Sequence, residues 1–217
     1  MQIVIPGALP PEPAAQSLMP YMAQRTPKLT RWFAGCSAHV QRINLLETAC
    51  TMPEYWAFTQ KHAFVPTEKQ NFSSGLGPFL EPNTQQPDAP VWIAELVHVS
   101  PSRDGAALLG ANQLGITQQE SVSLFKAAHE IFLRYGFSLH LGRQPWHWVA
   151  TPPQNMSLPS VSPKLVAHTR VNDWWPQDTA SRPWRQLVNE LQMTWHEHPV
   201  NRARNEAGQA AVNSIWL

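Results

Sequence analysis

The residues from Val91 to Val99 read Val-Trp-Ile-Ala-Glu-Leu-Val-His-Val and form a nearly continuous apolar run. A strand that is apolar at almost every position has no face left for solvent, so this run predicts a strand in the middle of its sheet. A second strand is expected from 106 to 109, after a turn at Asp104-Gly105.

Two capping boxes predict where helices begin. In each, a threonine is followed three residues later by a glutamate that can reach back to the threonine's backbone amide: Thr51 with Glu54, and Thr117 with Glu120. Apolar residues at helical spacing follow the second box, and Gly136 is a typical stop. Further helices are expected at 14–22, 26–34 and 181–198, and further strands at 3–5, 137–141, 146–150 and 212–217.

This order of elements is mixed and predicts an α/β fold that carries a mixed α+β subdomain. We expect residues 1–66 to form the N-terminal part of the α/β core and the polar, proline-rich segment 67–90 to be a loop or linker. Residues 91–175 would form the subdomain with its hairpin, and 176–217 a helix and a strand that return to the core. Because an apolar strand at 212–217 needs neighbours, we also expect the fold to be incomplete at this end.

The charge balance excludes several classes of partner. Net charge is +1 and no run of like charges occurs, so the sequence predicts neither nucleic-acid binding nor attraction to an anionic membrane. No apolar stretch approaches the roughly 18 residues of a membrane span, and residues 1–7 lack a basic signal-peptide start. Cys36 and Cys50 lack CxxC spacing and are typical of reduced thiols. We therefore expect a cytoplasmic protein of undetermined oligomeric state.

A weak ligand-binding set is predicted at the end of the central strand. His98 lies near that end, and Arg103 and Asp104 follow it. In open α/β sheets, ligands bind beyond the carboxyl ends of strands, and arginine can hold a phosphate or a carboxylate. Arg143 and His147 of the predicted hairpin are added to the set. The alternative is that these residues belong to ordinary surface turns.

Other histidines and the tryptophans allow more than one interpretation. His196 and His198 could offer imidazoles to a metal, but histidine also suits a helix end. His140 and His147 are expected to face each other on the hairpin, although two histidines lack the third ligand of a zinc site. We assign no metal ligand and no catalytic residue. Alternating positions favour core packing over a stacking platform for four tryptophans, at 146, 148, 174 and 175.

The C-terminal segment carries the most specific motif. His198-Pro199-Val200-Asn201 is followed by Arg204, Gly208 and Asn213. This spacing resembles the HPVN…R…G…AN signature of the archaeal-type, cofactor-independent phosphoglycerate mutases, which belong to the alkaline-phosphatase superfamily. Residues 116–149 resemble the subdomain of the same enzymes, and Thr26-Pro27-Lys28-Leu29 resembles their TPNLD segment. The chain is most similar to a bacterial offshoot, the regulatory protein RpfE-type family.

The resemblance implies a fold and a chemistry. It implies an alkaline-phosphatase-like sheet with an inserted subdomain, two divalent metals such as manganese or zinc, and a serine that carries the phosphoryl group. It also implies a mainly architectural C-terminal segment, so Arg202 and Arg204 are expected to pair with Glu197 or Glu206 rather than with an anion.

The sequence departs from that family where catalysis is concerned. Pro6 and Gly7 follow the first predicted strand where the family has a metal-binding aspartate. Ser37 is the nearest hydroxyl to the expected nucleophile and lacks its Gly-Ser-Asp context, and Arg103 is the single arginine that matches an arginine-rich substrate segment. At least half of the catalytic set is therefore missing.

Three hypotheses follow. The first is a degenerate phosphoglycerate-mutase-like protein with a binding or regulatory role, no mutase activity and no assigned cofactor. Its partner would be a small phosphorylated metabolite or a protein. The second is an active phosphomutase or phosphohydrolase that uses manganese or zinc. The third is a protein-interaction module that exposes the tryptophan-rich hairpin.

Overall fold

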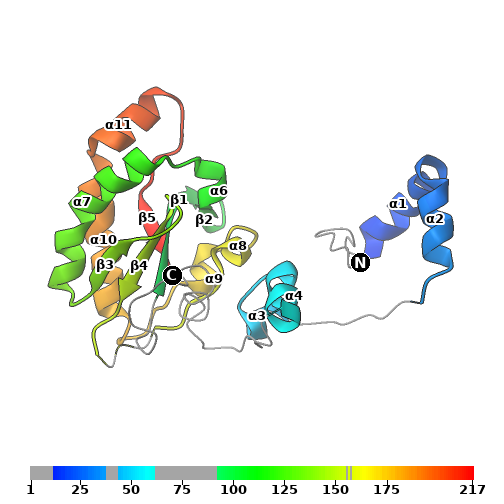
Figure 1. The fold of residues 1–217 in the computed structure, drawn as a ribbon, viewed down its shortest axis with the longest axis horizontal. Coiled ribbons are helices and arrows are strands. Elements are labelled where there is room, and N and C mark those ends of the chain that lie inside the picture. Colours follow the sequence, from blue (N-terminus) through cyan, green and yellow to red (C-terminus); the bar gives the residue numbers. More distant parts are fainter. Residues whose placement is uncertain (1–11, 38–43, 62–91, 155, 157) are drawn as a thin grey trace. The chain divides into compact units, whose positions relative to one another are not determined.

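A computed structural model describes residues 12–37, 44–61, 92–154, 156 and 158–217 (Figure 1). The chain divides into two compact units, Met1–Asn44 and Leu45–Leu217, and each is described by itself. The strand predicted at 3–5 and the whole linker predicted at 67–90 lie outside the described residues.

Two helices make up the described part of the first unit. Helix α1 (Glu12–Arg25) includes the predicted range 14–22 and continues through Pro20, and α2 (Pro27–Ala34) matches the helix predicted at 26–34. The Thr26 hydroxyl does not cap α2 and instead donates a hydrogen bond to the Met22 carbonyl oxygen (2.8 Å). Neither helix has a buried residue.

The second unit is built on an open antiparallel sheet in which one long strand contacts three others. Strand β1 (Trp92–Ser102) pairs with β4 (His147–Thr151) through residues 92–95, with β5 (Ser214–Trp216) through 95–97, and with β2 (Gly105–Leu109) through 98–102. Strand β3 (Ser138–Leu141) completes the order β2-β1-β4-β3, with β5 also on β1. The apolar run therefore forms a central strand, as predicted.

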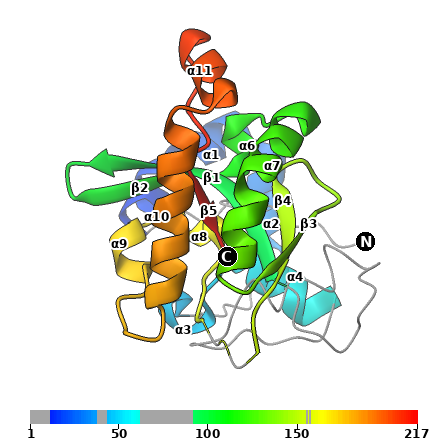
Figure 2. The same cartoon turned by 90° about the vertical axis from the view of Figure 1, so that its left-hand side faces the viewer.

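Helices α7 (Gln118–Arg134) and α10 (Arg182–His196) cover one face of this sheet (Figure 2). They bury the larger apolar cluster, which includes Leu96, Leu124, Phe132, Trp148, Trp195 and Ile215. A smaller cluster lies on the opposite face, where Val97, Leu108 and Trp216 meet the short helices α8 (Pro163–Val166) and α9 (Val171–Trp174). The sheet is thus covered on both faces, which explains why β1 has so few polar positions.

In both predicted capping boxes the glutamate reaches back to the threonine amide, and the reciprocal bond to the threonine hydroxyl forms at Thr117. The Thr117 amide donates to Glu120 Oε2 (2.8 Å), and the Glu120 amide donates to Thr117 Oγ1 (3.2 Å). At the start of α4 (Met52–Lys61), the Thr51 amide donates to Glu54 Oε2 (2.9 Å). The Ser162 hydroxyl also donates to the Glu54 carboxylate (2.7 Å to Oε2), so this box joins α4 to the start of α8.

The short helices were not predicted. They are α3 (Leu45–Thr48), α6 (Ala111–Leu114), α8 and α9, each of four residues. A single turn shows no helical repeat in the sequence, so periodicity cannot identify it. Helix α11 (Pro199–Glu206) lies between the helix predicted to end at 198 and the strand predicted from 212.

The chain is therefore a mixed α and β protein with an open antiparallel sheet in its described part. An alkaline-phosphatase type of sheet stays a prediction, as do the domain limits. The segments assigned to the subdomain and to the returning core share one sheet, because β5 pairs directly with β1. Among the described helices, none is both long and apolar enough to cross a bilayer.

Replacing Leu124 by alanine tests the packing of α7 on the sheet. Leu124 is 0% exposed in the larger cluster, whereas Leu133 on the same helix is 47% exposed. We expect Leu124→Ala to lower the free energy of unfolding by about 3 kcal/mol, because it removes buried methyl groups and leaves a cavity. Leu133→Ala should change it by less than about 1 kcal/mol. Urea denaturation measures both, and equal losses would contradict this packing.

Candidate binding site

The residues of the C-terminal signature hold the segment 198–213 in place. Asn201 Nδ2 donates to the carbonyl oxygens of Trp195 and Val212, and Asn201 Oδ1 accepts from the Val212 amide, all at 2.8 Å. Asn213 Oδ1 accepts from the Val99 amide, and Asn213 Nδ2 donates to the Val99 carbonyl oxygen (2.8 Å each). These two side chains form hydrogen bonds with backbone amide and carbonyl groups, and the bonds hold β5 beside β1.

Arg204 extends this set of bonds to the start of α7. Its side chain is 3% exposed and donates to the carbonyl oxygens of Ala210 (2.8 Å) and Leu114 (2.6 Å) and to Glu120 Oε1 (2.9 Å). The expected pairing with Glu197 or Glu206 is wrong for Arg204, because its guanidinium faces the core rather than its own helix. Burial works to raise the pKa of Glu120, but hydrogen bonds from the Thr117 amide and from Arg204 outweigh it and lower the pKa below its usual value.

His198 and Gly208 mark the two ends of α11. His198 Nδ1 accepts a hydrogen bond from the Val200 amide (3.3 Å), and burial lowers the pKa of His198. Gly208 has a φ of +70°, a left-handed conformation that favours glycine after a helix. Pro199 occupies the first turn, where its missing amide hydrogen costs nothing. The signature residues thus have structural roles.

The predicted ligand residues lie along β1 and its turns without converging. His98 Nδ1 is 2.8 Å from the Ala211 carbonyl oxygen, so that nitrogen carries hydrogen and donates. Arg103 and Asp104 are exposed in the turn between β1 and β2. Arg143 lies in the turn between β3 and β4. The Leu96 amide donates a hydrogen bond to the carbonyl oxygen of Trp146, which belongs to the same turn. The six residues 97–102 of β1 separate Leu96 from Arg103, a span of about 20 Å.

One predicted residue, His147, has a charged neighbour that the sequence analysis missed. Glu95 and Trp216 lie opposite one another in the β1–β5 register, and Glu95 and His147 in the β1–β4 register. The three side chains therefore form a row on one face of the sheet. His147 Nε2 is 3.6 Å from Glu95 Oε2, and the two side chains are 11% and 17% exposed. The Ala111 amide donates to Glu95 Oε1 (3.2 Å).

One nitrogen of the His147 imidazole faces Glu95, and the other lacks a hydrogen-bond partner among the described residues. That second nitrogen is Nδ1, and it is buried. The expectation that His140 would face His147 is wrong, because the register places His140 opposite Val149. The sequence signal for this pair is Glu95 itself, the one carboxylate inside an otherwise apolar run.

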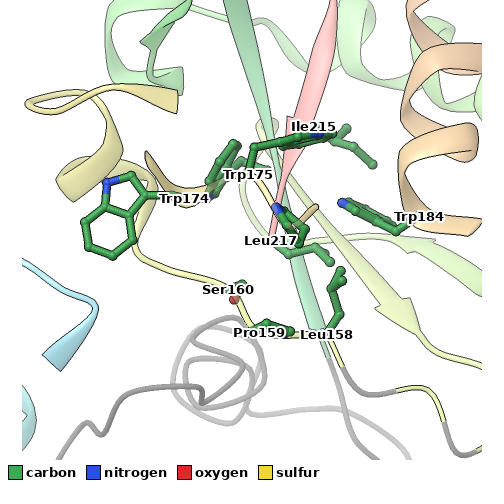
Figure 3. Close-up of a pocket in the computed structure, with 10 residues that line it drawn as sticks. Leu158, Pro159, Ser160, Trp174, Trp175, Trp184, Ile215 and Leu217 are labelled. Carbon is green, nitrogen blue, oxygen red and sulfur yellow. The ribbon is translucent and has the colours of Figure 1, made fainter. Parts of the chain in front are cut away.

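The tryptophans divide between the core and a pocket. In the hairpin, Trp148 is fully buried and donates from Nε1 to Ser121 Oγ (3.0 Å), and Trp146 packs against the same cluster. Core packing was thus the right interpretation of these two residues. Trp174 and Trp175 also pack against the smaller cluster, and they line a pocket together with Trp184 and Trp216, beside the end of β5 (Figure 3).

This tryptophan pocket is small: its cavity volume is about 10 Å³, which is room for about one water molecule. Its remaining lining comes from Leu158, Pro159, Ser160, Pro176, Ile215 and Leu217. The indole rings of Trp175 and Trp216 lie 5.7 Å apart at 44°. The platform weighed from the sequence comprised Trp146, Trp148, Trp174 and Trp175, and no sequence pattern connects it with Trp184 or Trp216.

No three histidine, cysteine, aspartate or glutamate side chains gather as a metal site within the ranges that the structure describes. Comparisons with family models, with curated proteins and with solved structures found no match to the chain. The resemblance to phosphoglycerate mutases therefore rests on the motifs quoted above.

Replacing Arg204 by methionine tests the buried ion pair. Arg204→Met removes three donors from buried or half-buried acceptors, so we expect a loss of about 3 kcal/mol in the free energy of unfolding. Arg202 is exposed on the same helix, and Arg202→Met should cost less than about 0.5 kcal/mol. Chemical denaturation compares the two variants, and a loss below about 1 kcal/mol for Arg204→Met would rule out the structural role.

The lowered pKa of His198 predicts a pH dependence of stability. The unfolded chain takes up a proton at His198 near pH 6.5, whereas the folded chain resists it. The contribution of His198 is therefore complete above that pH and is lost as the pH falls through it. Between about pH 7.5 and about pH 5, the wild type should lose more stability than His198→Asn, which keeps an acceptor at the helix start but does not titrate. Equal losses in urea denaturation would show that His198 does not contribute.

Proposed function

We propose that this chain is a binding protein built on a phosphoglycerate-mutase-like scaffold and that it has no mutase activity. The observation that carries the proposal is the spread of the predicted ligand residues over about 20 Å of β1 and its turns. Phosphoryl transfer needs the phosphate, its cationic partners and the nucleophile within a few ångströms of one another. Arg103 at the outer turn and Arg143 near Leu96 do not meet that requirement.

The sequence departures support the same conclusion. A two-metal site activates the nucleophile and stabilises both in-line oxygens, so the loss of a metal aspartate affects every step. Pro6 stands where the resemblance places that aspartate, and Ser37 lacks the context of a nucleophile. These positions lie outside the described residues or at their edge, and the support they give comes from the sequence.

The C-terminal signature is compatible with this loss. Asn201, Arg204 and Asn213 bond to carbonyl and amide groups of their own unit and to Glu120. A chain without mutase chemistry would still need these bonds in order to place β5. The signature can therefore persist for structural reasons when the catalytic residues have changed.

An activity assay tests the proposal. The purified chain is incubated with manganese or with zinc and then with 3-phosphoglycerate, and separately with p-nitrophenyl phosphate as a generic phosphomonoester. We expect rates equal to those without protein, because the groups that would hold and transfer the phosphoryl group do not converge. An active cofactor-independent phosphoglycerate mutase in the same buffer is the positive control. Turnover that a chelator abolishes would favour the alternative, an active metal-dependent phosphomutase or phosphohydrolase.

A further inference from the structure

We infer that helices α1 and α2 form a docking surface for an acidic amphipathic helix of a partner protein. The inference goes beyond the binding role proposed above, because it concerns the first unit and names a class of partner. Three observations carry it: an exposed apolar stripe on α2, basic side chains beside that stripe, and a corner between the two helices that hydrogen bonds hold in place.

The apolar stripe consists of Leu29, Trp32 and Phe33. These residues are spaced i, i+3 and i+4, so they lie on one face of α2. All three are exposed, and Trp32 is 60% exposed. The rings of Trp32 and Phe33 contact each other, with 5.2 Å between their centroids. Contiguous apolar surface of this kind marks interaction sites in soluble proteins, and tryptophan is enriched among the residues that dominate binding.

Helix α2 gains little stability from packing within its own unit. It is eight residues long and has no buried residue. Isolated helices of this length are marginal in water, because most helical stability in proteins comes from packing of an apolar face. A partner that covers the apolar stripe would supply that packing. Helix α1 offers further exposed apolar side chains to the same partner: Leu18, Met19 and Tyr21.

Basic side chains flank the apolar stripe. Lys28 and Arg31 each come one position before a stripe residue, and their i, i+3 spacing places them in a second row along α2. Both are exposed, and neither forms an ion pair with any residue that the structure describes. Residues 12–37 contain three basic residues and one acidic residue. Acidic groups on a partner would therefore complement this surface.

The charge also decides between possible occupants. A second copy of the unit would bring the same excess of positive charge, and like charges brought together oppose binding. Recognition of anionic lipid commonly uses about four to eight lysines and arginines, more than residues 12–37 contain. An acidic amphipathic helix meets both requirements. Its apolar residues at i, i+3 and i+4 would cover the stripe, and its carboxylates would face Lys28 and Arg31.

The corner between α1 and α2 is held in place by one carbonyl oxygen (Figure 1). The Met22 oxygen accepts from the Thr26 amide (2.9 Å), from the Thr26 hydroxyl (2.8 Å) and from the Thr30 hydroxyl (3.3 Å). These bonds tie the start of α2 to the last turns of α1. Less of the backbone must then be ordered on binding, and this lowers the entropic cost.

A matched pair of synthetic helical peptides tests the inference. Both carry leucine at i, i+3, i+4 and i+7, and the flanking positions hold glutamate in one peptide and lysine in the other. Titration of the full chain, followed by fluorescence anisotropy of labelled peptide, should show the glutamate peptide binding about ten-fold more tightly. Added salt should reduce this preference, because exposed charges are screened. Equal affinities, or no binding of the glutamate peptide at about 1 mM chain, would overturn the inference.

Two pairs of variants separate the apolar stripe from the basic row. Trp32→Ala should weaken binding of the glutamate peptide by about ten-fold, whereas Leu133→Ala, at an exposed position of α7, should leave it unchanged. Lys28→Glu should weaken the glutamate peptide and strengthen the lysine peptide. Lys126→Glu, also exposed on α7, should do neither. Equal effects of each variant and its control would overturn the inference. All four side chains are exposed, so the substitutions remove no buried contact.

Other occupants of the surface would give different results. Binding of the full chain to vesicles of equal parts phosphatidylcholine and phosphatidylserine, lost in Trp32→Ala, would assign the surface to lipid and overturn the inference. A dimer in sedimentation experiments that Trp32→Ala dissociates would assign it to a second copy, with the same consequence. These measurements are independent of the activity assay, since turnover of 3-phosphoglycerate would overturn the proposed function and leave the peptide titration unaffected.

Discussion

The bonds that fasten the C-terminal segment to β1 are the constraint on which the second unit depends. Asn213 joins β5 to Val99, Asn201 joins Val212 to the end of α10, and Arg204 joins α11 to Leu114 and Glu120. Each of these side chains satisfies backbone groups that have no partner in a regular helix or strand, so losing one would leave buried polar atoms unpaired. With β5 in place, Ile215 enters the larger cluster and Trp216 the smaller one. A strand of three residues thereby contributes to both faces of the sheet.

Two candidate sites depend on this strand. Trp216 extends the row that begins with His147 and Glu95, and it also forms a wall of the tryptophan pocket. The first site is polar and nearly closed, with a buried imidazole nitrogen that has no partner in the described part of the chain. The second is aromatic and partly open. The residues that resemble an enzyme signature therefore position the candidate sites and do not line them.

The sequence predicted what is decided locally. In both predicted boxes the glutamate bonds to the threonine amide, because residues three apart at a helix start can meet whatever the rest of the chain does. The central strand was also predicted, because a strand covered on both faces is apolar throughout. Single-turn helices such as α8 were missed, since one turn has no repeat to detect.

Contacts between distant segments could not be predicted in the same way. Arg204 was expected to pair with glutamates close to it in sequence, but it reaches Glu120, 84 positions earlier. Glu95 and His147 meet only because of the β1–β4 register, and a shift of one residue would send them to opposite faces. The tryptophan pocket takes its walls from α9, the start of α10 and β5, and no sequence pattern joins these three segments.

We propose that a phosphoglycerate-mutase-like scaffold persists here without the metal chemistry of that family. The metal content of the purified chain tests this proposal, after incubation with excess manganese and zinc and removal of free ions by gel filtration. We expect well below one bound ion per chain by elemental analysis. Two tightly bound ions per chain would contradict it, because a two-metal site would then have formed from residues that neither the resemblance nor the described structure identifies.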